Sequence, residues 1–368
     1  MQDSTNSTRN LDALRIFAAC AVIVLHYSDY VKDMPVGQFM IDHTWHFNLF
    51  VDLFFVVSGY VIARQYLGEV GDPLSLARFL WRRLARIYPL HLATLAFYVI
   101  IALALHFGLA STENLQRYPF SDLPAQLLLL HAFDGARLTF NFPSWSLSAE
   151  MFCYVLFPLV AMMVTRRKAL IVALIVLPAA ANSLYVYVAD TGPWPSWINQ
   201  GGAFRALPAF NLGIACCLFR DRIVRWPIVP GALPGLLTGY VLVGSLLPET
   251  VGLVAIYAIA VLAIQCDCAE RETLLIKLGF DRGSSLAYSC YMLHMPVATV
   301  VLTFGARYLE PYLPEARLVL IPVAIAVVAI ASVVSLRWFE MPMRIALNNL
   351  FDRHVGARSV STIADRPR

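Results

Sequence analysis

Charged residues are scarce in this chain. Asp, Glu, Lys and Arg together make up only 14% of its 368 residues, whereas 59% of the residues are hydrophobic. Soluble domains carry about 25% charged and about 45–50% apolar residues, so the composition excludes an ordinary soluble protein. The apolar residues form blocks along the whole chain that are close to the length needed to cross a bilayer.

The chain also lacks the common sequence signatures of soluble catalysis. It contains no glycine-rich phosphate loop, no Gly-x-Ser-x-Gly elbow and no His-Glu-x-x-His zinc motif. Its seven cysteines lie mostly inside apolar blocks, as small buried hydrophobic residues do. Because Cys266 and Cys268 have no second pair or histidine at ligand spacing, we expect no metal site.

The apolar blocks predict an all-α, polytopic integral membrane protein with about ten transmembrane helices. The predicted spans cover residues 11–30, 47–65, 87–109, 146–165, 169–189, 204–219, 229–247, 250–266, 285–308 and 317–336. The segment 123–133 is apolar but too short to span, so we expect a re-entrant or interfacial piece there. The domain division is then a cytoplasmic tail at 1–10, a membrane domain at 11–336 and a basic cytoplasmic tail at 337–368.

The basic residues predict the orientation of this bundle. With the N-terminus inside, 21 of the 28 Lys and Arg residues fall in cytoplasmic segments. The positive-inside rule therefore favours a multi-pass membrane protein with both termini cytoplasmic. The net charge of +4 reflects this orientation, and it does not indicate nucleic-acid binding.

An arginine and a histidine lie inside the first predicted span. Arg15 and His26 are eleven residues apart, which brings both side chains to within roughly 20° of one helix face, about 16 Å apart along the axis. Ionisable residues within a membrane span are costly, usually face a bundle interior or wet cavity, and indicate function. An imidazole in such a place can act as a general base.

Two carboxylates are candidate partners for this histidine. Asp52, in the outer half of the second predicted span, lies at about the depth that His26 reaches. It either supports the imidazole as a hydrogen-bond partner or forms a structural pair. Glu150 lies one turn into the fourth predicted span. If Ser146 caps that helix, Ala149 takes the third helical position, so Glu150 needs another partner within the bundle.

Polar side chains also recur before the third span and inside the ninth. Arg78, Arg82 and Arg86 are spaced i, i+4 and i+8, a basic stripe along one face of a short cytoplasmic helix. Such guanidinium groups either bind anionic lipid and set topology or bind a multiply phosphorylated ligand. In the ninth span, Tyr291 and His294 share a helix face, and a packing residue with satisfied polar atoms is the simpler interpretation of His294.

Six segments in order resemble the membrane acyltransferase family 3. They are Leu-Asp-x-Leu-Arg-x10-His at 11–26, Val-Asp-Leu-Phe-Phe-Val-x-Ser-Gly-Tyr at 51–60, Arg-Arg-x-x-Arg-Ile-Tyr-Pro at 82–89, Trp-Ser-Leu-x-x-Glu at 145–150, Tyr-x-x-Tyr-x-x-His-x-Pro at 288–296 and Phe-Glu-x-Pro-x-x-Arg at 339–344. The chain departs from the family at Ile16-Phe17, where a small-residue pair is common. The resemblance is to the form without an SGNH-type hydrolase domain.

The resemblance implies a reaction and a site. Members of this family transfer an acyl group, usually acetyl, from cytoplasmic acyl-CoA to sugars of O-antigen, exopolysaccharide, Nod factors and some macrolides. Their first-span arginine and histidine are needed for activity, and here these are Arg15 and His26. The family element proposed to hold the CoA phosphates corresponds to Arg82, Arg83 and Arg86, and Arg78 continues the same stripe. Arg15 would orient CoA.

The expected function is therefore acyl transfer from acyl-CoA to a hydroxyl of a free or lipid-linked sugar or glycan, with no tightly bound cofactor. His26 is the expected catalytic base, with Asp52 and Glu150 as candidate partners, and transient acylation of His26 is an alternative. The expected substrate-binding residues are Trp145, Ser146, Tyr288, Tyr291 and His294. Membrane lipids are the other expected partners, and the oligomeric state is not predicted. A polytopic transporter or a non-catalytic subunit of a polysaccharide export machine is the alternative function.

Overall fold

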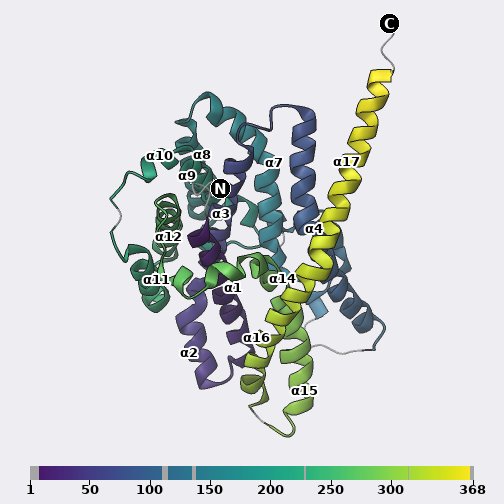
Figure 1. Ribbon diagram of the computed structural model, residues 1–368. Coiled ribbons are helices and arrows are strands. Elements are labelled where there is room, and N and C mark those ends of the chain that lie inside the picture. Colours follow the sequence, from purple (N-terminus) through teal and green to yellow (C-terminus); the bar gives the residue numbers. More distant parts are fainter. Residues whose placement is uncertain (1–7, 110–114, 135–137, 228, 314, 365–368) are drawn as a thin grey trace.

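The computed structural model describes the chain except residues 1–7, 110–114, 135–137, 228, 314 and 365–368. Within these limits the chain is a bundle of helices without a strand (Figure 1). Eight helical segments are long and apolar enough to span a membrane, and the shorter apolar helices α9 (Gly202–Leu218) and α11 (Ala232–Val243) stand at two further predicted spans. The all-α, polytopic class is confirmed.

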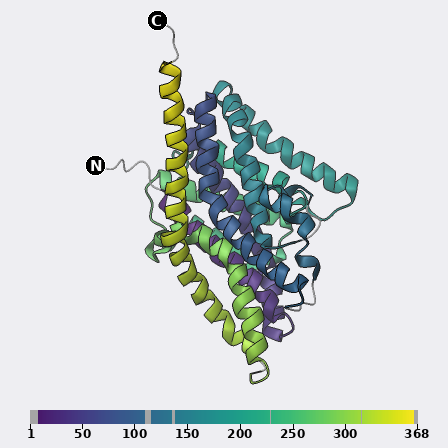
Figure 2. The same ribbon diagram turned by 90° about the vertical axis from the view of Figure 1, so that its right-hand side faces the viewer.

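The other described helices of ten residues or more are α1 (Arg9–Ser28), α2 (Pro35–Thr44), α3 (Phe50–Tyr66), α4 (Pro73–His106), α7 (Trp145–Arg166), α8 (Leu170–Ala189), α12 (Glu249–Cys268), α14 (Ala287–Ala298), α16 (Ala316–Ser335) and α17 (Met341–Ala364). All of these but α2 and α17 follow the predicted spans in order. A π-helical turn at Leu336–Glu340 joins α16 to α17. The predicted C-terminal tail is thus a helix that continues the last span, and it runs along one side of the bundle and past its end (Figure 2).

Helix α4 differs from the prediction at its start. The sequence predicts a short helix carrying the arginine stripe and a separate span from residue 87, whereas the structure has one helix of 34 residues. Asp72 caps this helix, accepting hydrogen bonds from the backbone N–H groups of Leu74 and Ser75 at 2.9 and 3.1 Å. Pro89 lies inside the helix without ending it. The arginines are therefore held on the same rigid element as the membrane span.

The segment 123–133 does not span, as predicted. It contains the short helices α5 (Leu123–Leu127) and α6 (His131–Asp134). Side chains from the spans satisfy its backbone: the ring of His91 bonds the Gln126 carbonyl at 2.9 Å, and Ser148 accepts from the Ala132 N–H at 3.1 Å. Irregular backbone persists at membrane depth only with such partners. Helix α6 of this segment packs against the start of α7.

Two glycines allow α3 and α9 to pack backbone against backbone at the centre of the bundle. A Cβ atom at Gly59 would lie 2.0 Å from the Phe210 carbonyl oxygen, and one at Gly213 would lie 2.0 Å from that of Val56. Membrane helices use small residues for such close approach. Because α9 is held this tightly against α3, Arg205 of α9 contacts Asp52 of α3 directly.

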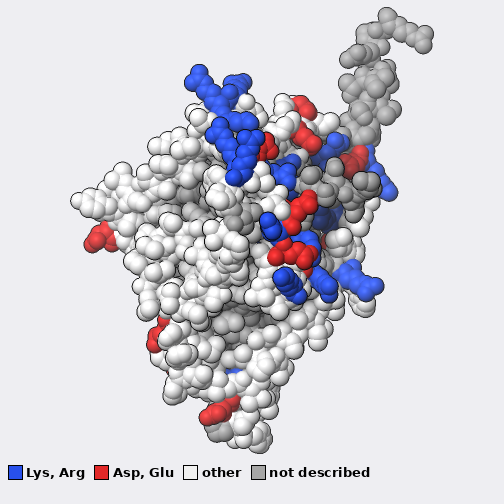
Figure 3. Space-filling model, turned by 60° about the vertical axis from the view of Figure 1, so that its left-hand side comes forward, with Lys and Arg blue, Asp and Glu red and all other residues white. Residues whose placement is uncertain are grey.

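Charge is distributed unevenly over the surface. Lys and Arg side chains gather in the upper and right-hand part of the face in Figure 3, beside a broad uncharged surface. We call the end of the bundle where α3 ends, α4 begins and α7 ends the basic end; its arginines include Arg64, Arg78, Arg82, Arg166 and Arg167.

Candidate active site

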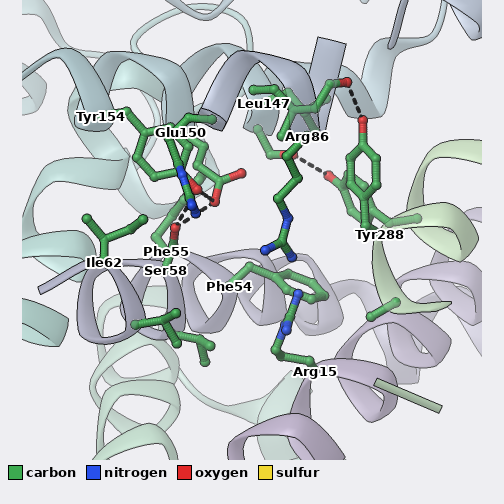
Figure 4. A pocket seen from close by; sticks show the side chains of 17 residues that line it. Arg15, Phe54, Phe55, Ser58, Ile62, Arg86, Leu147, Glu150, Tyr154 and Tyr288 are labelled. Atoms are coloured by element: carbon green, nitrogen blue, oxygen red, sulfur yellow. Dashed lines mark hydrogen bonds between the residues drawn. The ribbon is translucent and has the colours of Figure 1, made fainter. Parts of the chain in front are cut away.

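A cavity lies among α1, α3, α4, α7 and α14. Its volume is about 100 Å³, and a buried water needs about 10–15 Å³, so it has room for several waters or a narrow extended chain. Its polar lining comes from all five helices and consists of Arg15, Ser58, Arg83, Arg86, Ser146, Glu150, Tyr154, Tyr288 and Tyr291. Residues that the sequence places in five separate motifs therefore meet around one space (Figure 4).

Arg15 and Arg86 extend into this cavity from opposite sides. Arg15 comes from α1 and Arg86 from α4, and their guanidinium groups point toward one another beside the ring of Phe54 (Figure 4). Within the described residues, the only carboxylate in ion-pair range of Arg15 is Asp12 at 3.6 Å, and none is within that range of Arg86. Two guanidinium groups facing one space repel each other, and an anion between them removes that repulsion.

The carboxylate of Glu150 is bound by two hydroxyl groups in another wall of the cavity. Its carboxylate accepts hydrogen bonds from the Ser58 hydroxyl at 2.6 Å and the Tyr154 hydroxyl at 2.5 Å. The two hydroxyl oxygens are themselves 2.9 Å apart. Glu150 thus stands in the cavity wall as a hydrogen-bond acceptor, and no ion pair joins it to either cavity arginine in the described part of the chain.

Asp52 does not lie beside His26, so the expected contact between them is wrong. Its carboxylate forms an ion pair with Arg205 of α9, with Nη2 to Oδ2 at 2.6 Å, and the two side chains are 0% and 1% exposed. Arg205 also donates to the carbonyls of Trp197 at 3.0 Å and Asn48 at 3.2 Å. The structure therefore supports the structural alternative for Asp52. Position along two helices sets depth but not which faces meet, and the prediction used depth alone.

Arg205 is a residue that the sequence reasoning missed. It was visible as an arginine inside the sixth predicted span, 204–219, the same signal that singled out Arg15. The ring of Trp145 lies 5.2 Å from the Arg205 guanidinium carbon. Trp145 does not line the cavity. The predicted substrate residue is therefore a packing partner of this ion pair.

His26 meets another histidine. Its Nδ1 atom lies 2.7 Å from Nε2 of His294 on α14, and the two rings are nearly parallel, at 9°. Phe142 packs its ring against the same imidazole, with centroids 5.0 Å apart. His26 is partly exposed, whereas His294 is fully buried. Both ring nitrogens of His294 have partners, as the simpler interpretation expects, and one of these partners is the predicted base.

The tyrosines of α14 connect this histidine pair to the cavity. Tyr291 lines the cavity and lies one helical turn before His294. Its hydroxyl donates to the Pro143 carbonyl and accepts from Ser146, both at 3.0 Å. Tyr288 also lines the cavity, and its hydroxyl donates to the Ile87 carbonyl of α4 at 2.5 Å. The cavity therefore extends from the arginines of α4 to Tyr291, which lies one helical turn before His294 of the histidine pair.

The predicted arginine stripe divides into two groups. Arg83 and Arg86, spaced i, i+3, line the cavity, and Arg83 is buried with its Nη2 atom 3.3 Å from the Tyr66 hydroxyl. Arg82 does not line the cavity, and Arg78 lies 3.6 Å from Asp352 of α17. The i, i+4 spacing alone does not select Arg83, which the family resemblance names; its i, i+3 relation to Arg86 places both on the cavity face of α4.

Arg344 of α17 adds a further cation to this group. It lies within electrostatic range of Arg82, Arg83 and Arg86. Four guanidinium groups thus lie near one another at one end of the cavity, and such groups suit a ligand with several negative charges. No cluster of three or more His, Cys, Asp or Glu side chains suited to a metal occurs among the residues described.

These features define a class, a polytopic membrane protein whose arginine-lined cavity leads to a pair of intramembrane histidines. The sequence profile of the acyltransferase domain family matches residues 8–337. The chain therefore belongs to this family and is a membrane acyltransferase.

Two relatives support the assignment. The acyltransferase MdmB of Streptomyces mycarofaciens is 30% identical over 338 residues, which are 84% of this chain and 82% of that protein. Nodulation protein 10 of Rhizobium leguminosarum bv. viciae is 25% identical over 337 residues, which are 83% of this chain and 86% of that protein. No solved structure matches the chain.

Proposed function

We propose that this acyltransferase moves an acyl group, acetyl in the simplest case, from acyl-CoA to a hydroxyl of a free or lipid-linked sugar or glycan. The observation that carries the proposal is the pair of guanidinium groups, Arg15 and Arg86, that face each other across a narrow cavity without a carboxylate between them. A ligand with phosphates at one end and a thin chain at the other fits this arrangement, and CoA thioesters have that shape.

The donor would lie along the cavity. Its phosphates would contact Arg83, Arg86 and Arg15, with Arg82 and Arg344 adding positive charge at the basic end. The pantetheine arm carries amide N–H groups, and the Glu150 carboxylate in the cavity wall can accept hydrogen bonds from them. A donor that follows the cavity past Tyr288 to Tyr291 would have its thioester at the end of the cavity nearest to the pair of His26 and His294.

His26 would then act as the general base. Its imidazole takes the proton of the sugar hydroxyl while the oxygen attacks the thioester carbonyl carbon. The C–S bond breaks, the CoA sulfur leaves with the electron pair, and the imidazolium returns the proton to it. The products are a sugar ester and CoA thiol. The acceptor would approach His26 on its partly exposed side, away from the cavity.

The orientation is part of the proposal. The basic end would face the cytoplasm, where acyl-CoA is present, in the bacterial inner membrane with both termini inside. The division would be a tail at 1–10, the membrane domain at 11–336 and the tail at 337–368. Reporter fusions at Arg166 and Arg282 should report a cytoplasmic location, and an external location of either would overturn this topology.

The proposed reaction is tested with purified protein in lipid nanodiscs, acetyl-CoA and a glycan fraction from the host cell. We expect acceptor-dependent release of CoA thiol and an acetyl-sized mass increase on the glycan. His26→Ala should lower transfer by at least roughly 10²–10⁴-fold, the contribution of a positioned general base, with acetyl-CoA binding retained. A wild-type protein that binds the glycan but never cleaves the thioester would instead favour a transporter or a non-catalytic subunit.

A further inference from the structure

A chain of hydrogen bonds runs from a backbone carbonyl through two imidazole rings. The Tyr291 carbonyl oxygen lies 2.6 Å from Nδ1 of His294, and Nε2 of His294 lies 2.7 Å from Nδ1 of His26. Among the residues that the structure describes, the other ring nitrogen of His26, Nε2, has no hydrogen-bond partner. The chain therefore ends at a nitrogen that is open to a ligand.

The chemistry of the three groups sets the direction of this chain. A carbonyl oxygen only accepts hydrogen bonds, so Nδ1 of His294 carries the hydrogen. His294 is fully buried, and its ring contacts no carboxylate within the described part of the chain, which favours the neutral form. A neutral imidazole has one N–H group, so Nε2 of His294 is an acceptor and Nδ1 of His26 must donate to it. The lone pair of His26 is then on Nε2.

We infer that His294 is a positioning residue that holds His26 in the tautomer with the proton on Nδ1, so that Nε2 is the atom that takes the proton of the acceptor hydroxyl. The inference rests on the proposed function. The logic is that of a carboxylate that orients a catalytic histidine in hydrolases. Here a neutral imidazole, itself oriented by a backbone carbonyl, occupies the place of the carboxylate. When His26 becomes charged, its Nδ1–H still points at the lone pair of His294.

Contacts from two other elements hold His294 in this orientation. The hydroxyl of Tyr27, the residue after His26, donates to the His294 carbonyl at 2.9 Å. Pro296 has no N–H, which leaves the Met292 carbonyl without its helical donor, and Asn141 donates to that carbonyl at 3.1 Å. Because α1 and the loop before α7 both bind the backbone of α14 here, the His294 ring stays in register with His26.

The test compares two substitutions at His294. In His294→Gln the side-chain amide oxygen can take the place of Nε2 and accept from His26, whereas His294→Leu fills similar space without an acceptor. We expect the Leu variant to lose about 10²-fold or more in kcat with the KM for acetyl-CoA unchanged, because supporting partners of this kind contribute about 10- to 100-fold or more. The Gln variant should recover a substantial part. His43→Gln, on an exposed histidine of α2, is the matched control and should match the wild type.

Nitrogen NMR of the wild-type protein labelled in histidine tests the tautomer independently of whether the variants fold. The signals of His26, assigned by their loss in His26→Ala, should show a protonated Nδ1 and an unprotonated Nε2. A protonated Nε2 would overturn the inference, as would a Leu variant with wild-type kcat or a folded Gln variant no better than Leu. If the wild-type protein cleaves no thioester at all, the proposed function fails instead, and the NMR result still decides the tautomer.

Discussion

Two regions of this bundle hold arginines and carboxylates in opposite arrangements. Between α3 and α9, Arg205 and Asp52 contact each other directly, at 2.6 Å, and the remaining donors of Arg205 reach backbone carbonyls. In the cavity, Arg15 and Arg86 face each other while Glu150 bonds two hydroxyl groups on another wall. In the first region two opposite charges are in direct contact, whereas in the second two like charges face each other and their nearest ion pair is the longer Arg15–Asp12 contact at 3.6 Å.

Whether a buried charge is paired within the protein distinguishes structural residues from candidate ligand-binding residues better than the presence of the charge does. A buried ion pair whose hydrogen-bonding groups are all used has nothing left to offer a ligand, and removing one partner leaves an uncompensated charge. Like charges that converge on a space are costly unless a ligand of opposite charge enters. Both regions satisfy the rule that intramembrane charges indicate function, yet only the cavity is poised to bind.

The largest expected effect is on the stability that the ion pair of Arg205 and Asp52 provides. Arg205→Ala should reduce the free energy of unfolding by about 3–5 kcal/mol, because Asp52 would remain buried without its partner. The double substitution Asp52→Leu with Arg205→Met should recover much of this loss, since both charges are then absent. Thermal unfolding of the purified protein measures both. An Arg205→Ala protein as stable as the wild type would show that water already reaches this pair.

The next largest effect is on the binding of acetyl-CoA at Arg15 and Arg86 in the cavity. Arg15→Ala or Arg86→Ala should weaken acetyl-CoA binding by roughly 10- to 100-fold, corresponding to a lost charged hydrogen bond of about 1.5–3 kcal/mol. The melting temperature should not fall, because each substitution removes repulsion inside the empty cavity. Arg86→Lys should recover part of the affinity, since it restores charge without the guanidinium fork. If all three variants bound acetyl-CoA as tightly as the wild type, the cavity would not be the donor-binding site.

A smaller effect tests the packing that brings Arg205 to Asp52. In Gly213→Ala the new methyl group would meet the Val56 carbonyl at 2.0 Å, so α3 and α9 must separate. We expect a loss of about 1–3 kcal/mol in the free energy of unfolding, as for overpacking in other cores. Gly235→Ala on α11 is the control, because a Cβ there meets nothing within 4 Å. Similar melting temperatures for the two variants would contradict the backbone contact.

The sequence alone predicts the helices much better than their mutual contacts. The spans follow from the length of the apolar blocks, and Arg15 and Glu150 follow from the cost of charge in a membrane. Depth in the membrane can be read from position in a span, which is why Asp52 was expected near His26. The azimuth of each helix is set by tertiary packing, here by the glycine contacts of α3 and α9, and no local pattern encodes it.

The same limit explains the histidines. The motifs around His26 and His294 each show a ring inside a span, but only the packing of α1 against α14 brings the two rings to 2.7 Å. The arginines of α4 illustrate the converse. Helical periodicity places Arg83 and Arg86 on one face without any tertiary knowledge, and the i, i+4 spacing drew attention to Arg78 instead.

The smallest expected effect concerns Arg78, which separates the stripe into its two groups. Its guanidinium lies 3.6 Å from Asp352 and outside the cavity, with both side chains partly exposed to solvent. Exposed ion pairs contribute about 0–1 kcal/mol, so Arg78→Ala should change neither stability nor acetyl-CoA affinity by more than a few-fold. Asp352→Ala should behave in the same way if the only role of this arginine is to hold α17 against α4. Titration of acetyl-CoA into the two variants and Arg83→Ala provides the comparison. If Arg78→Ala lost as much acetyl-CoA affinity as Arg83→Ala, the phosphate site would extend along the whole stripe. The distinction between arginines paired within the protein and arginines available to a ligand would then not hold on α4.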